Sequence, residues 1–120
     1  MKHLMDGAQA EVLAKQYLES QGLHTVTTNY RCRFGEIDII MNDQSQLVFI
    51  EVRFRKKQLY GSALHSIDWR KQQRIVRSAS CFLQTHHTTA HDTCRFDVIA
   101  IGPSLANHHI DWVRSAFDGW

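Results

Sequence analysis

Four charged residues interrupt two neighbouring apolar segments of this 120-residue chain. Glu36 and Asp38 are two positions apart in the first segment, and Glu51 and Arg53 are two positions apart in the second. Because strand side chains alternate between faces, each pair is expected on one side and the intervening isoleucines, valine and phenylalanine on the other. Two adjacent strands of this kind would bring three carboxylates and a guanidinium together. Burying such a cluster is costly unless the charges pair or hold a metal, which predicts a site.

The chemistry that suits this cluster is phosphodiester hydrolysis. That reaction needs an activated water, neutralised phosphoryl oxygens and a stabilised leaving oxygen. Oxygen-rich carboxylate sites prefer Mg²⁺ or Mn²⁺, which can meet all three demands, and mutually repelling carboxylates bind a dication partly to relieve that repulsion. Arg53 could steady the transition state electrostatically. The alternative is a purely structural cluster, in which Glu51 and Arg53 form ion pairs with each other or with neighbouring strands and no metal takes part.

Hydrophobic patterning predicts a single α/β domain over residues 1–120, with a central mixed sheet flanked by helices. Asp6 is a suitable N-cap for the first helix, Gly22 a suitable stop, and 42–45 a polar hairpin turn. The predicted elements, in chain order, are a helix over 6–21, strands over 25–31, 36–41 and 47–54, a helix over 67–83, and strands over 96–101 and 110–113.

Each helix adds charged candidates. Glu11 shares the apolar stripe of Ala14 and Leu18, so it is either an edge residue that reaches water or a third acid over the sheet. On the second helix, Lys71 lies at the border of the apolar arc, from which it could reach the sheet. Three arginines occupy the opposite side, where a solvated face and phosphate contact are equally good interpretations. These arginines are Arg70, Arg74 and Arg77, and further basic residues, Arg55, Lys56 and Lys57, follow the acidic strands.

Composition limits the class of protein. The hydrophobic share of 43% and the charged share of 22% are typical of a soluble globular domain, and no apolar run at the start predicts a signal peptide or membrane span. Three cysteines without paired spacing predict free thiols in a reducing cytoplasm. The loop bearing His86, His87, His91 and Cys94 lacks the regular ligand spacing of a tetrahedral zinc site, as do His108 and His109, so we interpret it as exposed and polar.

Longer motifs resemble the YraN-like family of small bacterial proteins over residues 7–117. The D-(x12)-E-x-R spacing on consecutive strands also resembles the D…(E/D)-x-K core of the restriction-endonuclease-like nuclease superfamily, and the arrangement is similar to that of archaeal Holliday-junction resolvases. This resemblance implies a restriction-endonuclease-like fold. The motifs that carry it are G-A-Q-A-E-V-L-A-K-Q-Y-L from Gly7, N-Y-R-C-R-F-G-E-I-D-I-I from Asn29, F-I-E-V-R from Phe49, W-R-K-Q-Q-R from Trp69 and R-F-D-V-I-A-I from Arg95.

The resemblance implies roles for individual residues. Asp38 and Glu51 match the metal-binding acids, with the Val52 carbonyl as a further oxygen ligand, and Glu11 matches a helix acid that binds the metal through water. Arg53 stands where the superfamily has lysine and, because arginine stays protonated, it is a poor general base. Lys71 could fill that place, or catalysis could be lost. Three residues match motifs of the narrower family, with no role evident for the first and last: Glu36, Lys71 and Arg95.

The leading hypothesis is therefore a nucleic-acid-binding domain that cleaves DNA with Mg²⁺ or Mn²⁺. Asp38, Glu51 and Glu11 hold the metal, while Arg53 and Lys71 contact the scissile phosphate. Branched or structured DNA as substrate, and a homodimer, follow from the similarity to junction resolvases. The alternatives are a nucleic-acid-binding module without catalysis and a protein-interaction adaptor with a structural charge cluster. The residues expected to contact the nucleic-acid backbone are Arg70, Arg74, Arg77 and Arg55.

Overall fold

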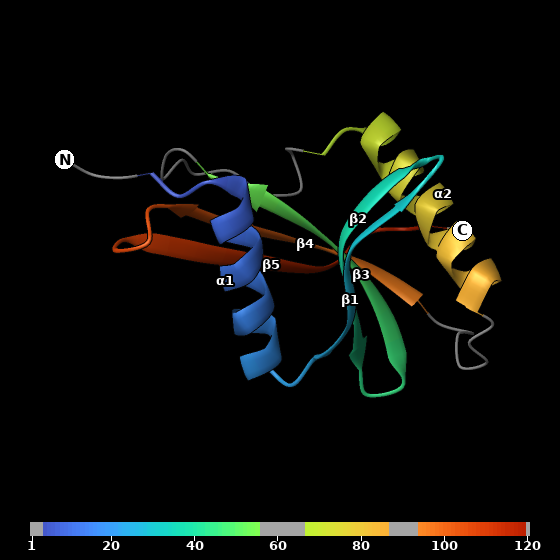
Figure 1. Ribbon diagram of the computed structural model, residues 1–120, viewed down its shortest axis with the longest axis horizontal. Coiled ribbons are helices and arrows are strands. Elements are labelled where there is room, and N and C mark those ends of the chain that lie inside the picture. The colour runs from blue at the N-terminus through green and yellow to red at the C-terminus, as the bar shows by residue number, and fades with distance from the viewer. Residues whose placement is uncertain (1–3, 56–66, 87–93, 120) are drawn as a thin grey trace.

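The computed structural model describes residues 4–55, 67–86 and 94–119 (Figure 1). Within these ranges the chain forms two helices and five strands, in the predicted order. In these ranges, no helix combines the length and the apolar character needed to cross a membrane. The elements are α1 (Gly7–Ser20), β1 (His24–Cys32), β2 (Gly35–Asp43), β3 (Gln46–Phe54), α2 (Trp69–His86), β4 (Cys94–Pro103) and β5 (His108–Phe117).

The five strands form one mixed sheet in the order β1-β2-β3-β4-β5. Neighbouring strands are antiparallel except for β3 and β4, which are parallel. Parallel strands need a long crossover connection, and α2 lies in the crossover between these two. The predicted α/β fold with a central mixed sheet is confirmed, and the arrangement is consistent with a restriction-endonuclease-like fold.

One helix covers each face of the sheet, and Figure 1 shows α1 and α2 on opposite sides of the strands. Alternating strand residues supply the two cores, as the period of a strand requires. The α1-side core comprises Ala14, Leu18, Leu23, Ile39, Met41, Val48, Ile50 and Ile99. The α2-side core comprises Ile37, Ile40, Leu47, Phe49, Ile75, Val76, Ala79, Phe82 and Phe96.

Side-chain caps set the helix ends. The Asp6 carboxylate accepts a hydrogen bond from the Gln9 backbone at 2.8 Å, and Gly22 takes a left-handed φ of 97° after α1, as predicted. The predicted start of the second helix at residue 67 was two residues early, because Asp68 caps the helix by accepting from the Lys71 backbone at 2.8 Å. The helix also runs past the predicted end at 83 to His86, whose ring lies 3.9 Å from that of Phe82.

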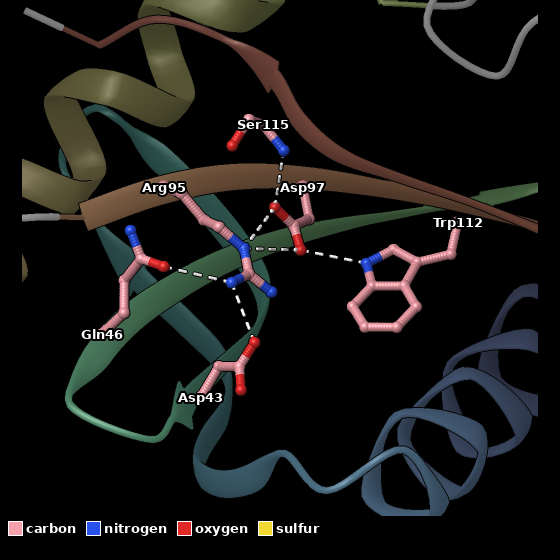
Figure 2. Close-up of polar contacts among 6 residues, drawn as sticks. All are labelled: Asp43, Gln46, Arg95, Asp97, Trp112 and Ser115. Carbon is pink, nitrogen blue, oxygen red and sulfur yellow. Dashed lines mark hydrogen bonds and ion pairs between the residues drawn. The ribbon is translucent and has the colours of Figure 1, made fainter.

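A buried polar network joins the β2–β3 turn to β4 and β5 (Figure 2). Arg95 on β4 donates from Nη1 to Asp43 at 2.8 Å and to Gln46 at 3.1 Å. Asp97, which is fully buried, accepts from Arg95 Nε at 3.1 and 3.2 Å, from Trp112 Nε1 at 2.9 Å and from the Ser115 backbone at 3.0 Å. Arg95 thus connects β4 to the β2–β3 turn, and Asp97 connects β4 to β5, so Arg95 stabilises the sheet.

Replacing Asp97 with alanine is expected to destabilise the protein by about 3–5 kcal/mol, because it removes the acceptor of three donors: Arg95 Nε, Trp112 Nε1 and the Ser115 backbone N–H. Chemical denaturation followed by circular dichroism measures the loss. Asp111→Ala is the matched control, since it removes an aspartate–arginine pair whose carboxylate is 51% exposed, and should cost about 1 kcal/mol or less. Equal losses in the two variants would contradict a stabilising role for the network.

Candidate functional site

Asp38 lies where the backbone pairing of β2 with β3 ends. That pairing runs from Asp43 opposite Gln46 to Ile39 opposite Ile50. Beyond it, the Asp38 Oδ2 atom accepts a hydrogen bond from the Val52 backbone N–H at 2.8 Å. The side chain thereby satisfies a donor that a strand neighbour would otherwise bind, and the carboxylate is held between the two strands.

The expected alternation along β2 is wrong at this point. Ile37 belongs to the α2-side core and Ile39 to the α1-side core, although regular alternation would place both on one face. Glu36 and Asp38 both lie close enough to Glu11 of α1 for their charges to raise its pKa. The Glu36 carboxylate is bridged to Glu11 by Asn29 and lies 3.7 Å from the Arg31 guanidinium. Asp38 is the member of the pair that acts directly on Glu51.

Glu51 is the most perturbed acid of the site. Its side chain is 5% exposed, with Oε2 at 3.2 Å from Lys71 Nζ and 3.9 Å from Arg53 Nη1. Burial, together with the hydrogen bond and charge of Asp38, raises the pKa of Glu51 to about 8, although Lys71 lowers it. The basic side chains that the structural alternative requires therefore lie beside Glu51. They do not compensate for burying this carboxyl next to Asp38, so Glu51 retains a proton near neutral pH.

Glu11 faces the same carboxylates from α1. It lines a hollow of about 260 Å³ together with Asp38 of β2 and Asn29 of β1. Burial, followed by the charges of Asp38 and Glu36, raises the pKa of Glu11. The structure therefore places this helix acid beside the sheet site and not solely against water. The other residues that line the hollow are Ala8, Val12, Lys15, Thr28 and Ile39.

Asn29 is a site residue that the sequence reasoning missed. With its amide nitrogen facing the two carboxylates, it donates to Glu11 Oε1 and Glu36 Oε1, each at 3.0 Å. Its backbone has a φ of 53°, a conformation that asparagine tolerates better than most residues. An asparagine inside the threonine-rich β1 segment was the available signal. The amide neutralises part of the repulsion between two acids that come from α1 and β2.

The donor set fits a hard divalent cation bound by two protein carboxylates. Mg²⁺ is commonly held by one or two carboxylates, with waters and substrate phosphates completing its shell. Asp38 and Glu51 are the adjacent pair; burial and then Asp38 raise the pKa of Glu51, and a dication would favour its ionised form. Among the residues that the structure describes, no three His, Cys, Asp or Glu side chains lie close enough to hold an ion together. Glu11 is therefore an outer neighbour.

The predicted basic residues divide into two groups. Arg70, Arg74 and Arg77 are exposed on α2, as the helical periodicity predicts. Arg55 is paired with Asp111 on β5, so the structure does not group it with the α2 arginines. Arg95 likewise belongs to the buried network. Lys56 and Lys57 lie outside the described residues.

The histidines do not gather where the structure describes them. The Nδ1 atom of His86 lies 3.0 Å from the Phe82 carbonyl oxygen, and His108 makes a similar contact to Leu105. His87 and His91 lie outside the described ranges. All three cysteines are free thiols.

Known proteins with similar sequences cover the part of the chain that carries the site. The sequence profile of the uncharacterised protein family UPF0102 matches residues 10–101, which include most of α1 and the strands bearing Asp38 and Glu51. The chain belongs to this family. A UPF0102 protein of Saccharophagus degradans is 49% identical over 97% of this chain and 95% of its own. One from Pseudomonas aeruginosa is 46% identical over 93% of this chain and 91% of its own. The predicted YraN-like membership is thereby confirmed at the level of the family.

Proposed function

We propose that this UPF0102 protein binds nucleic acid and hydrolyses DNA phosphodiesters with Mg²⁺ or Mn²⁺. The observation that carries the proposal is the Asp38–Glu51 carboxylate pair at the end of the β2–β3 pairing, with Lys71 Nζ 3.2 Å from Glu51. A buried Glu51 beside a partly buried Asp38, with the Lys71 ammonium next to them, suits a site for a dication and a phosphate. The similarity to the restriction-endonuclease-like superfamily supports the same chemistry, with branched or structured DNA as substrate.

Asp38 and Glu51 would hold the cation, with the Val52 backbone N–H fixing the orientation of Asp38. When bound, the cation would activate water and neutralise charge on the phosphate. Lys71 and Arg53, both beside Glu51, would contact the scissile phosphate and stabilise its negative charge in the transition state. Glu11, held by Asn29 across the hollow, would orient water toward this pair.

Calorimetric titration with Mn²⁺ tests the carboxylate pair without requiring DNA. Wild-type protein is expected to bind with a dissociation constant between about 1 µM and 1 mM, and the double variant Asp38→Ala with Glu51→Ala is expected to show no binding heat, because both anionic donors are gone. Glu19→Ala with Asp118→Ala is the matched control, since it removes two exposed carboxylates elsewhere. Heat that survives in the double variant would contradict this metal site, as would its absence from folded wild-type protein.

A second candidate function is nucleic-acid binding without catalysis, and Arg53 is the observation that favours it. Its guanidinium lies 3.9 Å from Glu51, in the sequence position where the superfamily has lysine, and arginine cannot act as a base near neutral pH. The proximity of Lys71 to Glu51 favours the first function, because α2 then supplies the lysine that β3 lacks. Salt-sensitive DNA binding with no cleavage in any divalent metal would identify the second function.

A further inference from the structure

The tip of the β1–β2 hairpin packs against the arginine-bearing side of α2, as Figure 1 shows for the hairpin end beside that helix. Gly35, which opens β2, has a φ of 149° that L side chains rarely adopt. A Cβ atom there would lie 3.5 Å from Ser78 Oγ and 3.8 Å from Arg74 Cβ. The hairpin therefore contacts α2 over one helical turn. This contact joins exposed residues of the two elements into one surface.

Two adjoining hollows form this hairpin–α2 surface, and Arg33 and Phe34 line both. The first, of about 460 Å³, also includes Arg77, and the second, of about 540 Å³, also includes Arg31 and Arg74. Four arginines and one phenylalanine thus line the two hollows. The second hollow also includes the carboxylate of Glu36, which is already paired with Arg31 at 3.7 Å. The surface therefore has an excess of positive charge.

The side chains of the hairpin tip add a stacking group to these charges. The Arg33 guanidinium lies over the Phe34 ring, 4.7 Å from its centroid. Nucleobases stack both on aromatic rings and on guanidinium planes, and neighbouring arginines bind phosphates bidentately. An acidic peptide would use the charges alone, whereas a nucleic-acid strand uses the charges and the stack. Bases become available for stacking where they are not paired in a duplex.

We propose that the hairpin–α2 surface binds a single-stranded segment of DNA, with a base stacked on Arg33 and Phe34 and phosphates on Arg74 and Arg77. This inference rests on the proposed nucleic-acid function and specifies its substrate class. From Phe34, β2 leads to Asp38 over roughly 13 Å, at about 3.3 Å per residue. The tip and the carboxylates are thus close enough for one nucleic-acid strand to reach both. The substrate that fits is a duplex with an unpaired tail or branch.

Fluorescence anisotropy with a labelled single strand, the matching duplex and a tailed duplex, all in EDTA, tests this surface without chemistry. Arg33→Ala and Phe34→Leu are expected to weaken binding of the single strand and the tailed duplex by at least about fivefold, and to reduce their advantage over the duplex. Arg114→Ala is the matched control: this exposed arginine stacks on Trp112 at 4.1 Å on β5, the opposite edge of the sheet. Its affinity should stay within about twofold of the wild type.

Salt dependence separates stacking from charge. Arg74→Ala should lower the slope of log affinity against log salt by about 0.7 on single-stranded DNA, the value of one lost phosphate contact, whereas Phe34→Leu should leave the slope unchanged. If the wild type binds DNA and the affinities of Arg33→Ala and Phe34→Leu equal that of Arg114→Ala, this inference is overturned. The proposed function would not be, because Mn²⁺ titration tests the carboxylates separately. Wild-type protein that binds none of the three DNA species would overturn the proposed nucleic-acid function as well.

Discussion

Asp38→Asn is expected to slow Mn²⁺-dependent cleavage of DNA at least about a hundredfold while leaving the fold intact. Asparagine keeps an oxygen that can accept the hydrogen bond from the Val52 backbone, so the contact between β2 and β3 survives. It removes the negative charge that we assign to cation binding. Because changes to residues that only support metal ligands cost about 10–100-fold, loss of a ligand charge should slow cleavage at least about a hundredfold. Single-turnover cleavage of labelled four-way-junction and tailed-duplex DNA measures the effect.

The matched control for Asp38→Asn lies on the same strand. Asp43→Asn makes the same chemical change five residues along β2, in the Arg95 network and away from Glu51. Its cleavage rate should stay within a few fold of the wild type, provided that thermal melting shows both variants folded. Wild-type turnover in Asp38→Asn would remove Asp38 from the mechanism. Salt-sensitive DNA binding by a wild-type protein that shows no turnover would favour the non-catalytic function. Arg53 in place of lysine would then mark a site that binds phosphate without cleaving it.

Glu51→Gln is expected to stabilise the metal-free protein at pH 8 and to remove most of the loss of stability that the wild type shows as pH rises. The folded-state pKa of Glu51 is about 8, above its ordinary value of 4.5, because of burial and Asp38. The folded protein therefore holds this proton more tightly than the unfolded chain. The resulting stabilisation is fully present below pH 4.5 and is lost as pH rises through 8. Between pH 5 and 8 the decline is about 3 kcal/mol.

Urea denaturation in EDTA at pH 5, 6, 7 and 8 measures this difference for the wild type and Glu51→Gln. Glu19→Gln is the control, because it changes one exposed carboxylate on α1 and should follow the wild-type curve. Mn²⁺ should raise the stability of the wild type at pH 8 and leave that of Glu51→Gln unchanged. Only the wild type has an ionised Glu51 whose charge the cation can compensate. A Glu51→Gln protein that is less stable than the wild type at pH 8 would mean that Lys71 stabilises the ionised form of Glu51 enough to outweigh burial.

Local patterning was sufficient for most of the fold. Helical periodicity and capping residues predicted α1 and α2, because these signals depend on residues within a few positions of one another. The β2–β3 hairpin was also predictable. A short turn sets the register of its two strands, and this register brings Asp38 close to Glu51. β5 was underestimated at four residues, whereas it spans His108–Phe117. It is an edge strand of mixed exposure, whose sequence carries a weak apolar signal.

The direction of each site side chain depended on the packing of distant elements. Alternation predicted Glu36 beside Glu51, whereas the contacts of Glu36 are with Asn29, which bridges it to Glu11, and with Arg31. Arg95 was recognised only as part of a motif, because its partners Asp43 and Gln46 are about fifty positions away along the chain. No local periodicity reports such contacts.

The order of the elements, the family and the carboxylates that suit a dication were predictable from the printed residues. These properties follow from residue types and from short spacings, which a linear pattern contains. The burial of Glu51 against Asp38 and Lys71, and the contact of the hairpin tip with α2, are evident only in the folded molecule. Burial, pKa and surface charge depend on which segments meet in space. Desolvation and Coulomb interactions depend on the distance between groups in the folded protein and not on their separation along the chain.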